Sequence, residues 1–135
     1  MITHIDHIVV NCRDVETTAT WYERALGLQR EAYTSPAGPG TRIALKFGRH
    51  KFNLRQTGDD SWVTCKVDAP GSLDFCFITE GSLKLMLQRW QAAGIAVVAG
   101  PGPRTGAMGQ MTSIYCEDPD GNLVEVATYA AEPLA

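Results

Sequence analysis

The chain has 135 residues, 44% of them hydrophobic, enough for one domain of ordinary size to bury a core without disulfides or a structural metal. Its formal net charge is −3 and its lysines and arginines are scattered, which excludes a basic surface for nucleic acid or an anionic membrane. No apolar run approaches the ~18 residues of a membrane-spanning helix, and no signal-peptide pattern opens the chain. We therefore expect a cytoplasmic protein with a small-molecule partner and neither a nucleic-acid nor a membrane partner.

In chain order, the first half of the sequence predicts a strand, a helix and three more strands. Residues 5–12 are rich in β-branched side chains and indicate a strand. A helix is predicted over residues 15–26, with Asp14 as its N-cap and Gly27 as its stop. The three later strands are predicted at residues 28–34, 41–47 and 51–56.

A polar segment at residues 58–71 is the predicted linker to a second half with the same order of elements. The predicted elements there are a strand at 73–79, a helix at 82–93, and strands at 95–99, 111–116 and 122–129. Residues 100–109 include four glycines, and we expect them to form a mobile loop at the mouth of a pocket. In that position Arg104 would reach the anionic end of a ligand.

The two halves are a repeat. The shift that aligns His7 with Asp74 also aligns Gly27 with Gly94, and both glycines end a helical pattern. We therefore predict a single α+β domain, residues 1–135, built from two βαβββ modules. The boundaries are module one at 1–57, the linker at 58–71 and module two at 72–130.

Polar residues interrupt the apolar strands at matching places in both halves, namely His7, Arg55, Asp74 and Glu125. Carboxylates such as Asp74 and Glu125 need a charge partner when they are buried among apolar side chains, and a cation satisfies that need. A lone histidine in a strand is more often a hydrogen-bonded core residue, but the repeat relation of His7 to Asp74 favours a ligand. A further set of polar residues could line the same site, namely Asn53, Ser113 and Tyr115.

Arg55 cannot bind a metal, because a guanidinium has no lone pair at accessible pH. Two roles remain open for it. It could pair with Asp74 and Glu125 in a metal-free pocket, or it could clamp a substrate carboxylate or phosphonate beside a metal.

Four cysteines have no zinc-like spacing, and we expect them to be buried, reduced thiols. They are Cys12, Cys65, Cys76 and Cys116. His4 and His50 fall at the terminus and in a turn, where surface positions are expected.

Three motifs resemble those of the vicinal oxygen chelate superfamily, which includes glyoxalases and bleomycin-resistance proteins, fosfomycin-resistance proteins and extradiol dioxygenases. They lie at residues 5–10 (IDHIVV), 21–28 (WYERALGL) and 118–125 (DPDGNLVE). Further segments look similar to the glyoxalase-domain-containing, virulence-associated group of this superfamily, at residues 51–54, 70–79 and 104–107.

This resemblance implies that the two modules form a curved, cup-like mixed sheet with the helices outside. Each module of the family offers one metal ligand from its first strand and one from its last, which gives His7, Asp74 and Glu125 here. Arg55 stands where relatives in the group more often have histidine. The implied cofactor is one divalent ion, Mn, Mg, Ni, Zn or Fe.

The implied function is a metal-dependent lyase or isomerase of the glyoxalase kind, acting on a small substrate that chelates the metal through adjacent oxygens. Glu125 and Arg55 would be catalytic, and the substrate would contact Arg55, Arg104, Asn53 and Tyr115. A homodimer follows by analogy with the family. Two alternatives stay open, a metal-free drug- or metabolite-binding protein of the bleomycin-resistance kind and a ring-cleaving dioxygenase.

Overall fold

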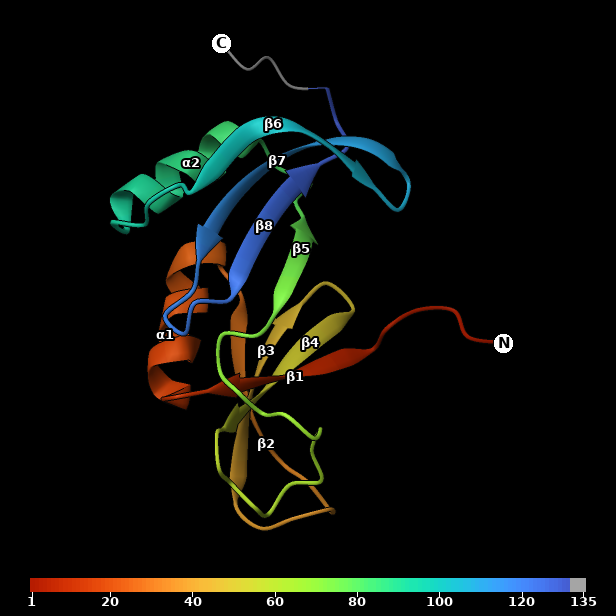
Figure 1. Cartoon of the computed structure of the whole chain (residues 1–135), viewed down its shortest axis with the longest axis vertical. Helices are drawn as coiled ribbons and strands as arrows, with labels where there is room; N and C mark the ends of the chain where they lie inside the picture. Colours follow the sequence, from red (N-terminus) through yellow and green to blue (C-terminus); the bar gives the residue numbers. More distant parts are fainter. Residues whose placement is uncertain (132–135) are drawn as a thin grey trace. The chain divides into compact units, whose positions relative to one another are not determined.

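The structure, a computed structural model that describes residues 1–131, divides the chain into two compact units with the boundary between Ser72 and Leu73. Each unit contains one four-stranded sheet and one helix, in the order strand, helix, strand, strand, strand (Figure 1). Both sheets are mixed, because the first and last strands of each unit run parallel and the other neighbours run antiparallel. The predicted α+β fold of two βαβββ modules is confirmed.

The first unit follows the predicted elements closely. It consists of β1 (His7–Cys12), α1 (Val15–Leu26), β2 (Gln29–Thr34), β3 (Thr41–Phe47) and β4 (His50–Gln56). The strand order is β1-β4-β3-β2, so β4 lies inside the sheet between β1 and β3. Residues 57–72, which follow β4, belong to this unit.

Helix α1 begins and ends at the residues that the sequence predicts. The Asp14 side chain accepts a hydrogen bond from the Glu16 amide at 3.1 Å, and Gly27 ends the helix with a φ of 70°. The helix buries Tyr22 completely, and the ring of Tyr22 makes a T-shaped contact with that of Phe52, with centroids 5.8 Å apart. Helix α1 therefore covers the face of the sheet to which Phe52 points.

The opposite face of this sheet is its polar face. Side chains alternate along a strand, so Asn53 and Arg55 point away from α1 if Phe52 points toward it. His7 is the register partner of Lys51 in the parallel pair of β1 and β4, which places both on the face of Asn53 and Arg55. The candidate site residues of the first unit thus share one face.

The second unit repeats this plan. It consists of β5 (Asp74–Ile78), α2 (Leu83–Ala92), β6 (Ala99–Gly106), β7 (Gly109–Glu117) and β8 (Leu123–Thr128), with the strand order β5-β8-β7-β6. Helix α2 starts after Ser82, whose hydroxyl accepts from the Lys84 amide at 3.0 Å, and it buries Leu83 and Trp90. Neither described helix is long and apolar enough to cross a membrane.

The glycine-rich segment 100–109 is a hairpin, so the expected loop is wrong. Residues 100–106 belong to β6, which pairs antiparallel with β7 as far as Gly106 opposite Gly109. The predicted strand at 95–99 is also wrong, since only its last residue lies in β6. Glycine and proline predict a loop when the segment is considered alone. However, β6 is an edge strand with a neighbour on one side only, so the proline residues, which have no backbone N–H, leave no carbonyl of a second neighbouring strand without a donor.

All four cysteines are free, and two of them are buried as expected, Cys12 and Cys116. Cys65 and Cys76 are exposed, so the prediction of buried thiols is wrong for both. Cys65 lies in the polar segment 57–72, which is outside the helix and the strands of the first unit. Cys76 lies on the same face of β5 as the exposed Asp74, because the two residues are one full alternation apart.

Candidate functional site

The polar face of the second sheet gathers several predicted site residues around Glu125. Glu125 is half-buried in β8, and its register partners are Cys76 of β5 and Tyr115 of β7. Asp74 precedes Cys76 by two residues and so lies on the same face. The two carboxylates predicted as metal ligands are therefore neighbours on adjacent strands of one sheet.

The carboxylate of Glu125 is held by a buried hydroxyl. Ser113, which has no exposed surface, donates from Oγ to Oε2 of Glu125 at 2.6 Å. A distance this short is typical of a hydroxyl bonded to an ionised carboxylate. Cys76 is a second neighbour: partial burial of its thiol and the negative charge of Glu125 raise the pKa of Cys76 to about 12. At neutral pH the thiol is protonated, and its Sγ donates to the carbonyl of Phe77 at 3.6 Å.

Tyr115 and Arg104 extend this cluster along the sheet. The Nε of Arg104 donates to the hydroxyl oxygen of Tyr115 at 3.0 Å, and the guanidinium lies 5.2 Å from the centroid of the ring. Burial raises the pKa of Tyr115, Arg104 opposes that shift, and Glu125 adds to it. The phenol is therefore a proton donor beside Glu125, and the exposed Arg104 supplies a positive charge at its other side.

Asp74 is exposed, which differs from the buried position expected from its apolar strand. The reason is that β5 is an edge strand with one covered face, and Asp74 lies on the other. The argument that burial demands a cation therefore does not apply to Asp74. What this residue retains is a carboxylate one strand away from Glu125.

In the first unit, His7 and Asn53 lie on the polar face in different environments. His7 is at the start of β1, with 45% of its side chain exposed, and its Nδ1 lies 2.8 Å from Oδ1 of Asp6. Asn53 is buried, and its Oδ1 is a buried atom with no hydrogen-bond partner. Both residues thus keep a side-chain atom without a hydrogen-bond partner, Nε2 of His7 and the acceptor Oδ1 of Asn53. His4 is exposed, as expected, and His50 is half-buried.

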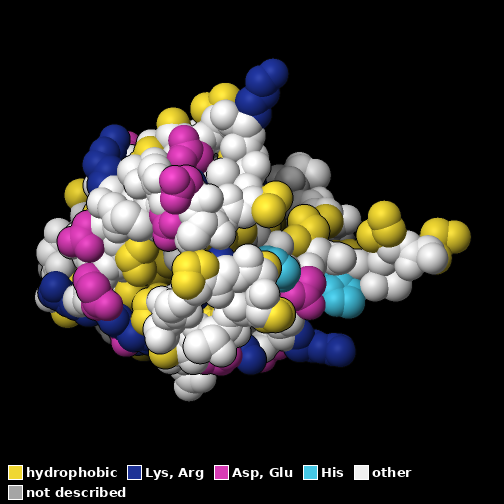
Figure 2. Space-filling view, turned by 90° about the horizontal axis from the view of Figure 1, so that it is seen from below, with side chains coloured by type: hydrophobic (Ala, Val, Ile, Leu, Met, Phe, Trp, Pro, Cys, Tyr) yellow, Lys and Arg dark blue, Asp and Glu magenta, His cyan; other side chains and the backbone are white. Residues whose placement is uncertain are grey.

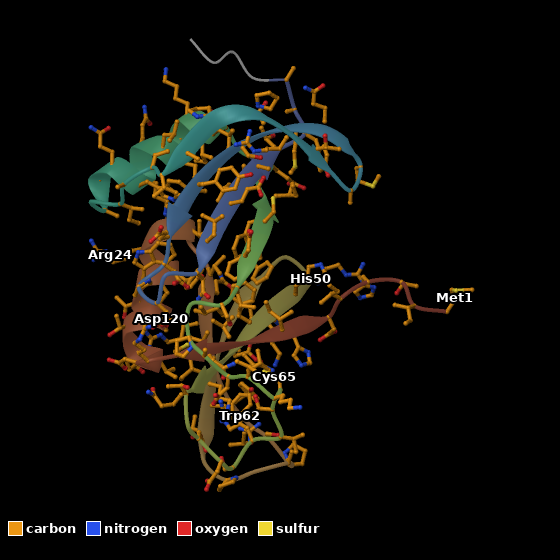
Figure 3. The ribbon with its side chains drawn as sticks, viewed as in Figure 1. Met1, Arg24, His50, Trp62, Cys65 and Asp120 are labelled. Carbon is orange, nitrogen blue, oxygen red and sulfur yellow. The ribbon has the colours of Figure 1, made fainter. Side chains whose placement is uncertain are left out.

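Arg55 is almost completely buried, with 3% of its surface exposed, and its partners come from its own unit. Its Nη1 donates at 2.8 Å both to Oδ1 of Asn11 and to Oδ2 of Asp68, and its Nη2 donates to the carbonyl of Asp59 at 2.6 Å. Asp68 and Asp59 belong to the segment after β4. This segment also carries Trp62, labelled in Figure 3. Arg55 therefore fastens residues 57–72 to the end of the sheet.

The sequence pointed to neither Asp6 nor Asp68 as a partner of a site residue. Asp68 lies in a polar segment without periodicity, so nothing local connects it with Arg55. The apolar pattern of its strand predicts a buried Cys76, whereas its spacing of two residues from Asp74 indicates the polar face. Among residues 1–131, no group of three or more His, Cys, Asp or Glu side chains is positioned to hold a metal ion.

Comparison with known proteins adds a family to this geometry. The profile of the Glyoxalase/Bleomycin resistance protein/Dioxygenase superfamily matches residues 4–126. Virulence protein STM3117 of Salmonella typhimurium is 40% identical over 129 residues, which cover 96% of this chain and 86% of that protein. The glyoxalase domain-containing protein RDO1 of Mycosarcoma maydis is 41% identical over 128 residues, which cover 95% of this chain and 69% of that protein.

Among solved structures, an integron cassette protein from the mobile metagenome of V. cholerae has the same fold with a TM-score of 0.89. It is 40% identical to this chain, and the match covers 96% of this chain and 98% of that one. The similarity thus extends through both units.

Proposed function

Since the chain belongs to the Glyoxalase/Bleomycin resistance protein/Dioxygenase superfamily, we propose that it is a divalent-metal-dependent enzyme of the glyoxalase-like lyase or isomerase kind. Members of this superfamily commonly bind a divalent metal ion, and they bind small molecules. The proposed substrate is a small molecule that presents two adjacent oxygens. The observation that carries the proposal is the pair of carboxylates, Asp74 and Glu125, on adjacent strands of one polar face.

The proposed metal ligands are His7, Asp74 and Glu125. A neutral imidazole and two carboxylates suit Mn, Mg, Ni, Zn or Fe, and three protein ligands leave positions open for substrate oxygens. Two observations support this set, the absence of a hydrogen-bond partner for Nε2 of His7 and the exposure of Asp74, while the described residues contain no group of three such side chains positioned to hold an ion. When bound, the ion would polarise the adjacent oxygens of the substrate and stabilise negative charge that develops on them.

The second unit supplies the groups that handle protons in this proposal. Ser113 restrains Oε2 of Glu125, so the other carboxylate oxygen would either bind the ion or accept a proton from a substrate carbon and return it, one role at a time. Tyr115 stays protonated and can donate a hydrogen bond to a substrate oxygen. Arg104, joined to Tyr115, would contact an anionic group on the same substrate.

Arg55 and Asn53 have supporting roles in the first unit. The ion pair with Asp68 offsets the positive charge of Arg55, which would otherwise weaken the binding of a nearby cation. For Arg55 to act on substrate, an incoming carboxylate or phosphonate would have to replace Asp68 on Nη1. Asn53 offers its unused Oδ1 as an acceptor for a substrate hydroxyl.

A metal-free binding protein is the second candidate, and Arg55 is the observation that favours it. Arg55 cannot bind a metal, and the strand register gives the place of Glu125, opposite Cys76 of β5, to Asn53, opposite Val9 of β1, and not to Arg55 as the sequence repeat predicts. The first unit therefore has no carboxylate at that place. Such a protein would sequester a drug or metabolite and have no turnover.

The experiment is metal analysis of protein purified without chelator, followed by titration of the metal-free protein with Mn²⁺, Zn²⁺ and Ni²⁺. We expect one ion per chain and a loss of at least several-fold in the Asp74→Ala variant. Asp60→Ala, which removes an exposed carboxylate from the segment after β4, is the matched control and should bind as the wild type does. Wild-type metal content in Asp74→Ala would make the ligand assignment wrong, and absence of binding by the wild type would favour the metal-free candidate.

We also propose that the protein is a homodimer, because members of the superfamily usually act as dimers. A cytoplasmic location is part of the same proposal and is consistent with four free cysteines. Light scattering during gel filtration should give twice the mass of the chain, 14.7 kDa.

A further inference from the structure

Two arginines lie opposite each other at the end of β3 and β4 in the first unit. Ala44 of β3 is the register partner of Asn53 of β4, and both belong to the polar face. Two residues further along this antiparallel pair are Arg42 and Arg55, so alternation places both of them on the same face. Like charges in such a position repel, and a bound anion would stabilise the pair.

Arg42 has a hydrogen-bonding edge that is buried and unused. Its Nε and Nη2 atoms are both buried, and neither has a hydrogen-bond partner. These two atoms form one edge of the planar guanidinium, the edge that holds a carboxylate or a phosphate through two parallel hydrogen bonds. A buried donor of a charged group that has no acceptor costs free energy, and an anion on this edge would remove that cost.

Neighbouring residues hold the guanidinium of Arg42 in place. Its Cζ lies over the ring of Trp62, which Figure 3 labels, at 3.9 Å from the centroid. A cation–π contact stabilises the charge without supplying a hydrogen-bond acceptor to Nε or Nη2. On another side, Gly38 lies close to Nη2, since a Cβ added there would be 2.5 Å from this atom. A side chain at Gly38 would therefore displace the edge.

Arg55 and Asn53 add two more buried atoms without a partner on this face. They are Nε of Arg55, a residue with 3% of its surface exposed, and Oδ1 of Asn53. Both guanidinium groups also lie near one carboxylate: hydrogen bonds from Ser61 lower the pKa of Asp59, and the charges of Arg55 and Arg42 add to this lowering. The unused donors of the two arginines thus belong to one neighbourhood.

We propose that Arg42 and Arg55 form a binding site for the anionic group of a small molecule, a carboxylate or a phosphate. Arg42 holds two oxygens of this group through Nε and Nη2, and Nε of Arg55 donates a third hydrogen bond. Oδ1 of Asn53 accepts a hydrogen bond from a hydroxyl or amide of the same molecule. On the face that Figure 2 draws, Lys and Arg side chains are scattered among acidic and hydrophobic ones, so no surface patch there offers an anion the same donors.

This site lies entirely within the first unit and requires no metal ion, so it goes beyond the proposed function. The first test is NMR of the wild-type protein, titrated separately with inorganic phosphate and with acetate at constant ionic strength. The Nε–H signals of Arg42 and Arg55, assigned through the backbone resonances, should shift until they saturate. The Nε–H signal of the exposed Arg49 is the control and should not shift.

The two anions distinguish the chemical class of the ligand. Saturation with phosphate alone supports a phosphate-bearing ligand, saturation with acetate alone supports a carboxylate, and saturation with both supports a site that accepts either group. The absence of a saturable shift at Arg42 with either anion would overturn the proposal. Equal shifts at Arg49 would overturn it too, because they would reflect a general effect of salt.

The second test separates the two-donor edge of Arg42 from its charge. We expect Arg42→Gln to weaken binding of the anion at least about tenfold, because hydrogen bonds from a charged group are lost. Arg42→Lys keeps the charge without the planar edge and should bind with intermediate affinity. Gly38→Ala should also weaken binding, since its Cβ displaces Nη2 while the backbone, which has no positive φ, accepts alanine.

Arg49→Gln is the matched control, which removes an exposed arginine and should bind the anion as the wild type does. Wild-type affinity in Arg42→Gln would overturn the proposal. These titrations contain no metal ion, so their failure would leave the metal-dependent function untouched. Failure of metal binding would likewise leave the anion site untouched.

Discussion

The hydroxyl of Ser113 and the carboxylate of Glu125 form a 2.6 Å hydrogen bond between adjacent strands of the second sheet. Ser113 has no exposed surface, so bulk water does not reach its hydroxyl. The bond restrains one oxygen of Glu125 and fixes the direction of the other. A ligand that must meet a metal ion at a defined distance benefits from such restraint, because less conformational freedom is lost on binding.

Removing this hydroxyl should weaken metal binding. We expect Ser113→Ala to lower Mn²⁺ affinity about tenfold, because outer partners of ligating carboxylates typically contribute 10–100-fold. The stability cost should be about 1.5–3 kcal/mol, the usual range for a hydrogen bond to a charged group. Thr112→Val removes a hydroxyl from the preceding residue of β7, on the opposite face, and should leave the affinity unchanged. Equal Mn²⁺ affinity of Ser113→Ala and the wild type would show that Glu125 needs no restraint.

The ion pair between Arg55 and Asp68 should make the stability of the first unit depend on pH. The hydrogen bond from Arg55 holds the pKa of Asp68 below its ordinary value. A lowered folded-state pKa means that the stabilisation is fully present above the unfolded pKa of about 4 and is lost as the pH falls through the folded value. Asp68→Asn should therefore be less stable than the wild type near pH 7, and the difference should shrink toward pH 3.

Urea unfolding at a series of pH values measures this difference, with Asp60→Asn as the control for a neighbouring exposed carboxylate. If the difference between wild type and Asp68→Asn is the same at pH 7 and pH 3, the ion pair does not stabilise the unit.

The repeat made the fold and the polar faces predictable, whereas the partners of the polar residues were not. Helix α1 was predicted to the residue because Asp14 and Gly27 are local signals that act within one turn. The pairing of Glu125 with Tyr115 depends on the register of β7 against β8, which alternation within one strand does not fix. Arg55 likewise pairs with a segment that has no periodicity, and such a contact is fixed only when the chain folds back on itself.

The segment that forms β6 is a second case in which local sequence signals do not predict the structure. Its composition predicts a loop, and its residues are strand-forming only because β7 supplies a ladder on one edge and nothing is required on the other. The strand propensity of a residue type describes the segment alone and therefore does not include the contribution of the neighbouring strand β7.

The thiol of Cys76 should react slowly with alkylating reagents although the residue is exposed. Its pKa of about 12, raised first by partial burial and then by Glu125, leaves very little thiolate at pH 8. We expect iodoacetamide to modify the exposed Cys65 first, as measured by peptide mass spectrometry. Glu125→Gln should accelerate the modification of Cys76, because it removes the negative charge that disfavours the thiolate. Rapid labelling of Cys76 in the wild type would contradict this environment.

Two glycines in β6 provide a matched test of the hairpin. Gly100 has a φ of 82°, and a Cβ at this position would collide with the carbonyl oxygen of Ser113. Gly102 has no positive φ, and its added Cβ would meet only Nη1 of Arg104, at 3.5 Å. Gly100→Ala should therefore destabilise the protein by about 2–4 kcal/mol, since an alanine there is strained and must also displace β7. Gly102→Ala should stay within about 1 kcal/mol of the wild type.

Thermal and urea unfolding measure both variants. Because Ser113 bonds Glu125, displacement of β7 in Gly100→Ala should also weaken Mn²⁺ binding, while Gly102→Ala should bind normally. The comparison separates a strand from a loop, since a free loop would accept alanine equally well at both positions. Equal stability of the two variants would therefore mean that β6 is not held against β7 at Gly100.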